Sequence, residues 1–178
     1  ILYSYAETEA LLAALLEVRP VTIRFAGKLA AGERETLIRR LCEKGCRIWP
    51  HPYVKQAYYL ENCDNITRLP GFQEGMFTVQ DAISMLAVAA ADICQGDTVL
   101  DICASPGGKM VLAAEYAGAD GSVKARDITE GKVAKIAENV ERMKLGNVST
   151  EVWDAAVFDE GAVKSADVVL ADVPCSGL

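Results

Sequence analysis

The apolar and polar positions in the first part of the chain follow two short patterns. In residues 32–45 the apolar side chains fall on one helical face and the charges on the other, which predicts an amphipathic helix. Residues 20–25, PVTIRF, are rich in β-branched side chains and begin at a proline, which is typical of a strand. A helix over residues 6–18 and short strands over residues 46–50 and 57–61 are also expected. This order indicates a small α+β unit.

A different pattern begins near residue 78, where long helical stretches alternate with apolar runs. The expected elements, in order, are a helix over 78–94 that Thr78 or a neighbour caps, a strand over 98–102, a helix over 109–117, a strand over 121–127, a helix over 129–146, and strands over 148–154 and 166–172. Such alternation predicts a parallel sheet wrapped by right-handed crossovers, an α/β fold. Ligands of these sheets bind beyond the carboxyl ends of the strands.

A stretch with one proline and two glycines, residues 62–75, separates the two patterns and is expected to be a linker. We therefore divide the chain into a small subdomain over residues 1–70 and a larger core over residues 71–178. The strand, helix, strand, strand order of the small subdomain resembles half of a ferredoxin-like or RNA-recognition-type fold.

The net charge of −7 is divided unevenly between these two parts. Residues 1–70 hold ten Lys or Arg and eight Asp or Glu, whereas residues 71–178 hold eight and seventeen. The first part, at +2, could follow a phosphate backbone, and ordinary surface scatter is the alternative. No uninterrupted apolar stretch reaches the roughly 20 residues of a membrane span, so we expect no membrane partner.

The six cysteines and the single histidine, His51, argue against a metal site. Cys42 and Cys46 are separated by three residues, and no matching Cys or His pair follows them. The chain is also too long and too rich in apolar residues for a disulfide scaffold. We therefore expect reduced thiols, no bound metal and a cytoplasmic protein.

Residues 101–109, DICASPGGK, place a proline and two glycines between an apolar strand and a helix. Glycines allow a tight turn and the close approach of a ligand, and the helix that follows presents unpaired N–H groups to an anionic end. The stretch lacks the Walker pattern, because Met110 follows Lys109, and it lacks the G-x-G-x-x-G fingerprint. These departures favour a nucleoside cofactor without a pyrophosphate.

Four acids stand at the ends of the expected parallel strands: Asp101, Asp127, Asp154 and Asp172. Because the carboxyl ends of parallel strands meet at one edge of the sheet, we expect these acids to line one cleft. Asp127 is placed to accept hydrogen bonds from both ribose hydroxyls, and Asp154 could accept from an adenine amino group. The set indicates S-adenosylmethionine on a Rossmann-like methyltransferase, although each acid alone could be a solvated turn residue.

The segments DICASPGGK, ARDITEGK, WDAAVF and ADVPCSG resemble, in order, signature segments of the RNA cytosine-5 methyltransferases. The resemblance covers roughly residues 18–178 and is greatest to the bacterial ribosomal-RNA methyltransferases of the Sun (RsmB) type. It implies a Rossmann-like class I methyltransferase core, truncated at its C-terminus, after a small RNA-binding subdomain. It also implies a monomer that transfers a methyl group from S-adenosylmethionine to carbon 5 of a cytosine, in small-subunit ribosomal RNA or alternatively in tRNA.

The resemblance assigns roles to particular residues. The cofactor's methionine end is expected to contact Cys103, Ala104, Ser105, Pro106, Gly107, Gly108 and Lys109. Asp127 would hold the ribose, Asp154 the adenine, and Lys132 would lie beside the nucleoside. Asp172 would lie near the methyl group and the target base.

The family's reaction uses two cysteines. One thiolate adds to carbon 6 of the cytosine, so that carbon 5 can attack the methyl group, and a second cysteine assists release of the product. Cys175 is expected to be the second cysteine, with a small buried thiol as the alternative. The nucleophilic cysteine and further strands are expected after Leu178, and without them we expect weak cofactor binding or none, and no methyl transfer. A module that binds S-adenosylmethionine or RNA without turnover, and an enzyme for an amine acceptor, are the alternatives.

Overall fold

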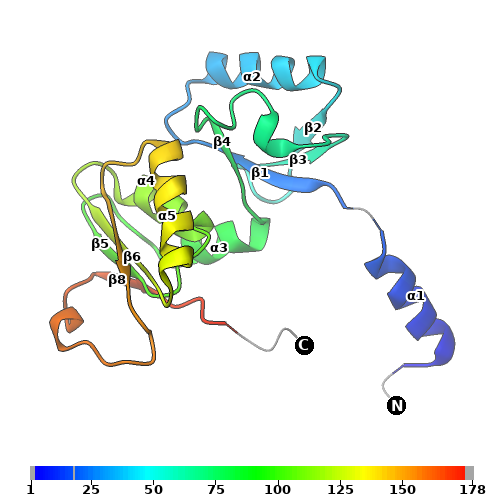
Figure 1. The fold of residues 1–178 in the computed structure, drawn as a ribbon. Coiled ribbons are helices and arrows are strands. Elements are labelled where there is room, and N and C mark those ends of the chain that lie inside the picture. Colours follow the sequence, from blue (N-terminus) through cyan, green and yellow to red (C-terminus); the bar gives the residue numbers. More distant parts are fainter. Residues whose placement is uncertain (1–2, 18, 175–178) are drawn as a thin grey trace.

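A computed structural model describes residues 3–17 and 19–174, which form two four-stranded sheets (Figure 1). The first sheet has the order β2-β3-β1-β4 and its neighbouring strands are all antiparallel. Its elements are β1 (Val21–Phe25), α2 (Ala31–Glu43), β2 (Arg47–Pro50), β3 (Ala57–Glu61), the short 3-10 helix η1 (Ile66–Arg68) and β4 (Phe77–Val79). The helix α2 covers this sheet with the buried Leu37 and Leu41, as its apolar stripe predicted.

The strand β4 carries the first sheet beyond the stretch that the sequence indicated as a linker. Phe77 pairs with Phe25, and Val79 pairs with Ile23. Thr78 therefore lies within a strand, and Asp81 caps the helix that follows by accepting a hydrogen bond from the N–H of Ile83 at 2.8 Å. The division at residue 70 stays a prediction, since the first sheet extends to Val79.

The second sheet has the order β7-β6-β5-β8 and is parallel throughout, which confirms the predicted α/β class. Its elements are α3 (Ala82–Ala90), β5 (Thr98–Asp101), α4 (Gly108–Ala117), β6 (Ser122–Asp127), α5 (Glu130–Met143), β7 (Val148–Val152), the short 3-10 helix η2 (Glu160–Ala162) and β8 (Val168–Leu170). The helices α4 and α5 pack against β5, β6 and β7 and contact each other, and α3 packs on α4. The core of this unit is formed by the inner face of α4 with Val99, Val123 and Ile136.

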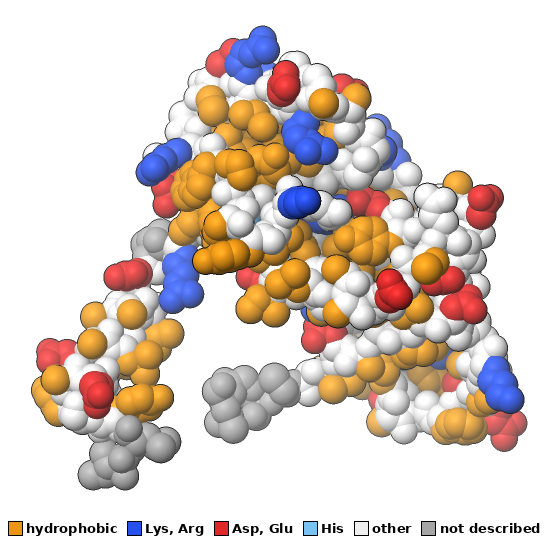
Figure 2. All heavy atoms as spheres, turned by 180° about the vertical axis from the view of Figure 1, so that it is seen from behind, with side chains coloured by type: hydrophobic (Ala, Val, Ile, Leu, Met, Phe, Trp, Pro, Cys, Tyr) orange, Lys and Arg blue, Asp and Glu red, His pale blue; other side chains and the backbone are white. Residues whose placement is uncertain are grey.

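The helix α1 (Tyr5–Leu15) stands apart from both sheets (Figure 1). Ser4 and Glu7 form a capping box at its start, and none of its residues is buried. Figure 2 shows hydrophobic side chains spread over this helix on the face in view. No helix among the described residues is long and apolar enough to cross a membrane.

Arg142 of α5 links the second sheet to the strand β4 of the first. Its Nη1 donates to the backbone oxygens of Phe72 at 2.9 Å and Phe77 at 3.0 Å, and its Nη2 donates to Asn139 at 2.9 Å. The guanidinium also lies 4.2 Å from the ring centroid of Phe72. A single side chain therefore satisfies two carbonyls that lie far from it in the sequence.

We expect Arg142→Ala to lower the free energy of unfolding by about 2–4 kcal/mol, because it leaves several partly buried acceptors without a donor. Urea unfolding followed by circular dichroism measures this change. Arg39→Ala is the matched control, because Arg39 is exposed on α2. Equal unfolding midpoints for the two variants would contradict the structural role of Arg142.

Candidate functional site

The glycine turn between β5 and α4 has the backbone that the sequence indicated. Gly107 adopts a φ of 112°, a left-handed conformation that side chains disfavour, and a Cβ there would lie 3.1 Å from Met110 Cε. Gly107 is also the N-cap of α4 and supplies no side chain to its first N–H groups. These donors remain free for a ligand with an anionic end.

Backbone and side-chain hydrogen bonds hold the turn against the neighbouring strand and helix. The N–H of Ser105 donates to Asp127 Oδ2 at 3.0 Å, and the N–H of Ala104 donates to the carbonyl of Arg126 at 2.9 Å. From α5, Asn139 Nδ2 donates to the carbonyl of Pro106 at 2.8 Å. The turn is thus fixed on both sides before any ligand is present.

A cavity of about 210 Å³ opens beside the turn. Many of the residues assigned to the site from the sequence line it, namely Asp101, Cys103, Ala104, Ser105, Pro106, Gly108, Lys109 and Asp172. It is also lined by Val79, Gln80, Asp81 and Ser84, which the sequence analysis did not assign to the site. These four residues lie where β4 leads into α3, so the first sheet supplies one wall of the cavity.

Asp101 is the most deeply buried acid that lines this cavity, at 1% exposure. Burial raises its pKa to about 6, although the N–H of Cys103, which donates to Asp101 Oδ1 at 3.3 Å, and the charge of Lys109 oppose this. The carboxyl is therefore poised to change charge just below neutral pH. A cationic group of a ligand placed beside it would favour the ionised form.

The thiol of Cys103 lies in an environment that keeps it protonated. Burial raises its pKa, and the negative charges of Asp127 and Asp101 raise it further. A thiol needs a lowered pKa to act as a nucleophile at neutral pH. The structure thus supports the expectation that Cys103 contributes backbone contacts.

Lys109 and Asp172 face each other across the mouth of the cavity. Lys109 Nζ lies 2.5 Å from Asp172 Oδ2, which joins the first turn of α4 to the segment after β8. Asp172 remains more than half exposed, with 61% of its side-chain surface accessible. An exposed ion pair of this kind contributes little to stability, so it can be broken by a ligand at low cost.

Asp127 is buried behind the turn, at 3% exposure. Burial alone would raise its pKa, but the hydrogen bond from Lys132 and those from the N–H groups of Ser105 and Ile128 outweigh burial and lower it. Lys132 Nζ lies 3.0 Å from Asp127 Oδ1. The residue is thus a charged carboxylate that the exposed Lys132 covers.

The remaining predicted residues lie elsewhere. Asp154 is exposed after β7, accepts a hydrogen bond from the N–H of Ala156 at 2.9 Å and does not line the cavity. Cys175, expected to assist product release, lies outside the described residues. Of the four strand-end acids, Asp101 and Asp172 line the cavity, and Asp127 contacts its wall through Ser105.

The four additional lining residues could have been sought in the pattern Thr-Val-Gln-Asp at residues 78–81. We assigned this stretch to a helix, yet it alternates like a strand and ends in a good N-cap residue. Gln80 is 4% exposed and lies next to Gly108, where a Cβ would approach Gln80 Cγ at 3.7 Å. The signal available in the sequence was Gln80, a polar residue directly before the N-cap residue Asp81 at the junction of a strand and a helix.

A parallel sheet with a glycine turn after its central strand, a bare helix N-terminus and an acid at the end of the next strand defines a Rossmann-like methyltransferase core. Within that class, residues 88–178 match the family described as 16S rRNA methyltransferase RsmB/F. The chain belongs to this family, as the sequence motifs indicated.

Individual relatives agree with this assignment. The chain is 39% identical to the probable ribosomal RNA small subunit methyltransferase B of Synechocystis sp., over 64% of this chain and 26% of that protein. It is 29% identical to the ribosomal RNA small subunit methyltransferase F of Escherichia coli, over 95% of this chain and 40% of that protein. The crystal structure of PH0851 superposes with a TM-score of 0.83 at 28% identity, over 96% of this chain and 39% of the other.

The chain therefore spans well under half the length of these curated relatives. The aligned region includes both sheets in the comparison with PH0851, since only 4% of this chain lies outside it. The arrangement of the small antiparallel sheet beside the parallel sheet is thus shared with a solved structure.

The raised pKa of Asp101 predicts how stability depends on pH. The folded state retains a proton that the unfolded state releases between about pH 4 and pH 6, so this carboxyl favours folding at low pH, and that contribution is lost as pH rises to about 6. Asp101→Asn cannot ionise and still offers an oxygen to Cys103. The free energy of unfolding of the variant, relative to that of the parent chain, should therefore increase by roughly 3 kcal/mol between about pH 4 and pH 7.

Urea unfolding at several pH values across this range measures the difference. Asp120→Asn is the matched control, because Asp120 is exposed between α4 and β6. If the profiles of the parent chain and Asp101→Asn run parallel, burial of Asp101 does not have the effect that we assign to it.

Proposed function

We propose that this protein transfers a methyl group from S-adenosylmethionine to carbon 5 of a cytosine in small-subunit ribosomal RNA. The single observation that carries the proposal is the fixed glycine turn of residues 103–109 beside the buried Asp127, in a chain of the RsmB/F family. The curated relatives are named as ribosomal RNA small subunit methyltransferases, which supports the substrate class.

The residues present fit the chemistry of this cofactor. Free N–H groups at the start of α4 suit a carboxylate, and the buried Asp101 suits an ammonium group, so the turn would receive the methionine end. Asp127 would hold the ribose hydroxyls, in exchange for or beside its contact with Lys132. Asp154, exposed beyond β7, would accept from the adenine amino group.

The cofactor supplies an electrophilic methyl group, and the protein must make carbon 5 of the cytosine nucleophilic. Addition of a thiolate to carbon 6 would convert the ring into an enamine, whose carbon 5 would bond to the methyl group as the sulfur–methyl bond breaks and S-adenosylhomocysteine leaves. Loss of the proton from carbon 5 and elimination of the thiol then restore the aromatic ring. In this scheme Asp172 hydrogen-bonds the cytosine ring nitrogen or amine, and Cys175 assists the release step.

The surroundings of Asp172 support such a role. It lines the cavity after β8, its ion pair among the described residues is with Lys109 in the first turn of α4, and 61% of its side-chain surface is exposed. A target base must be unstacked from the RNA to reach it. The apolar Val79 also lines this cavity and is 45% exposed, which would suit one face of that base.

We expect Asp127→Ala to weaken the binding of S-adenosylmethionine by on the order of 1–3 kcal/mol, roughly fivefold to 150-fold in affinity. The reason is that buried ribose hydroxyls would lose their acceptor. Isothermal titration calorimetry with S-adenosylhomocysteine measures the change, and Asp120→Ala at the opposite edge of the sheet is the control. Unchanged affinity in Asp127→Ala, with the control also unchanged, would refute the ribose assignment.

The reaction itself needs the nucleophilic cysteine of this scheme, so it is tested with a protein that includes that cysteine, incubated with methyl-labelled S-adenosylmethionine and unmodified small-subunit ribosomal RNA. Digestion to nucleosides followed by mass spectrometry should place the label in 5-methylcytidine. Label in any other nucleoside, or label in tRNA but not in ribosomal RNA, would overturn the proposed substrate. Cofactor binding without any methyl transfer would support the alternative of a binding module.

A further inference from the structure

A second and larger cavity, of about 890 Å³, lies on the other side of the joint between the two sheets. Its walls include Gly27 and Lys28, which follow β1, and the segments that precede β6 and β7, among them Ala119 and Asn147. Those segments lead into the amino ends of the parallel strands, whereas the glycine turn lies at the carboxyl ends. The second cavity is therefore separate from the proposed cofactor site.

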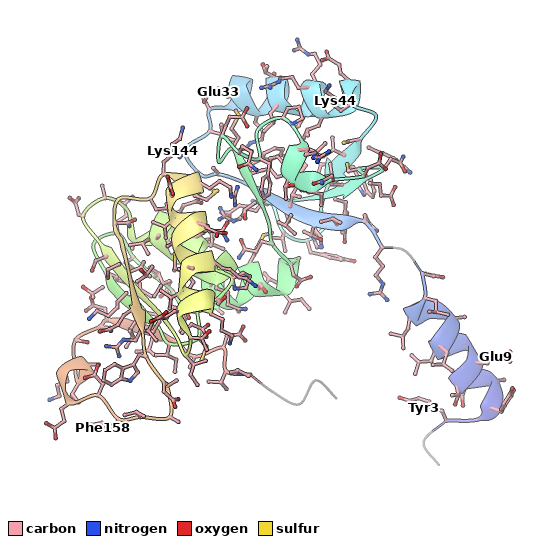
Figure 3. The ribbon with its side chains drawn as sticks, viewed as in Figure 1. Tyr3, Glu9, Glu33, Lys44, Lys144 and Phe158 are labelled. Atoms are coloured by element: carbon pink, nitrogen blue, oxygen red, sulfur yellow. The ribbon has the colours of Figure 1, made fainter. Side chains whose placement is uncertain are left out.

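The lining of this cavity is strongly basic. Its cationic residues are Arg24, Lys28, Arg34, Lys55 and Lys144, and its one acidic residue is Glu115. They come from both units, because Lys144 follows α5 and the others belong to the first 70 residues. Figure 3 shows Lys144 at the end of α5 that faces the segment between β1 and α2, where Glu33 marks the start of α2.

Arg24 lines the cavity, is only 1% exposed and carries one buried donor without a partner among the described residues. Its Nε donates to Gln80 Oε1 at 2.8 Å and its Nη1 to Glu115 Oε2 at 2.5 Å, while its Nη2 is buried and finds no acceptor among the described residues. The Nε of Arg34, which lines the same cavity, is also buried and has no acceptor among the described residues. A buried donor without a partner is unfavourable, so two of them on residues that line one cavity favour an acceptor supplied by a ligand.

The helix ends nearby do not account for this collection of cations. Helices α4 and α5 end at the cavity, and their last carbonyls attract positive charge. Asn147 Nδ2 already donates to the carbonyls of Ala114 and Gly118, each at 2.9 Å, and Lys28 Nζ donates to that of Met143 at 2.8 Å. Arg34, Lys55 and Lys144 form no ion pair among the described residues, so their charge remains available.

We propose that this basic cleft binds the phosphate backbone of the RNA substrate, at a site separate from the one where the base reacts. The inference rests on the proposed function for the identity of the nucleic acid. Arginine guanidinium groups suit phosphate oxygens, and Arg24 and Arg34 each keep one donor that has no acceptor among the described residues. The second unit carries an excess of acids, which makes this cleft and the first sheet the more favourable surfaces for the phosphate backbone.

The test compares two double variants that remove the same charge. Arg34→Gln with Lys55→Gln alters the cleft, and Arg39→Gln with Lys44→Gln alters exposed positions of α2 and its end that do not line it. Fluorescence anisotropy with a labelled single-stranded fragment of small-subunit ribosomal RNA, repeated over a range of salt concentrations, gives the affinity and its salt dependence. Circular dichroism melting verifies that both variants fold.

In the cleft variant we expect the RNA affinity to fall by about tenfold or more and the slope of log affinity against log salt to fall by about one to two, as lost phosphate contacts release fewer counterions. In the control variant both quantities should change little. The affinity for S-adenosylhomocysteine should be the same in all three proteins, because none of the four substituted residues lines the cofactor cavity.

The outcomes separate this inference from the proposed function. If the cleft and control variants bind RNA alike while the cofactor still binds, the cleft inference is overturned and the methyltransferase proposal is untouched. If RNA binding depends on the cleft but the protein that includes the nucleophilic cysteine neither binds S-adenosylhomocysteine nor methylates cytosine, the cleft stands and the proposed function fails. Inorganic phosphate could instead bind the parent protein and not the cleft variant, while both proteins bind RNA with the same affinity. The cleft is then a site for free phosphate, and the RNA inference is overturned.

Discussion

The buried guanidinium of Arg24 imposes the main constraint on how the two sheets sit together. A charge at 1% exposure requires compensation, and Arg24 on β1 finds it in Glu115 on α4 and Gln80 at the end of β4. These partners belong to different layers, so the ion pair fixes the first sheet over the helix that begins at the glycine turn. Removing only one partner would leave a buried charge uncompensated, and the joint is therefore specified by polar contacts as much as by apolar ones.

The candidate cofactor site depends on this joint because its walls come from both sides of it. The glycine turn, Asp101 and Asp172 belong to the parallel sheet, whereas Val79 and Gln80 arrive from the first sheet. Arg142 holds the backbone that leads into this approach, at Phe72 and Phe77. The small sheet thus contributes to the shape of the candidate cofactor site.

Much of this architecture could be predicted from the sequence, because the relevant signals are local. The apolar runs, the prolines and the glycines located the strands of the parallel sheet, and the sequence DICASPGGK located the turn. The start of α3 was misplaced, because Thr78 and Asp81 are both good N-cap residues and only pairing with β1 decides between them. The burial of Asp127 behind Lys132 and the exposure of Asp154 depend on side chains distant in sequence, which no local pattern encodes. The basic cleft likewise brings Arg34 and Lys55 together with Lys144. Charge counting could not indicate this, because Lys144 belongs to the part of the sequence with an excess of acids.

The hydrogen bond between Arg24 and Gln80 has a thermodynamic consequence, since each residue lines a different cavity. An anion bound in the basic cleft would attract the guanidinium of Arg24 and weaken its hydrogen bond to Gln80. The position of Gln80 beside Gly108 would then be less stable. Linkage then requires the effect to be reciprocal: whatever factor a ligand in one cavity imposes on the affinity of the other, the second imposes on the first. Two sites at opposite ends of the parallel strands would share a coupling free energy through a single buried side chain. The order in which the two ligands bind would then affect the rate of assembly but not the stability of the ternary complex.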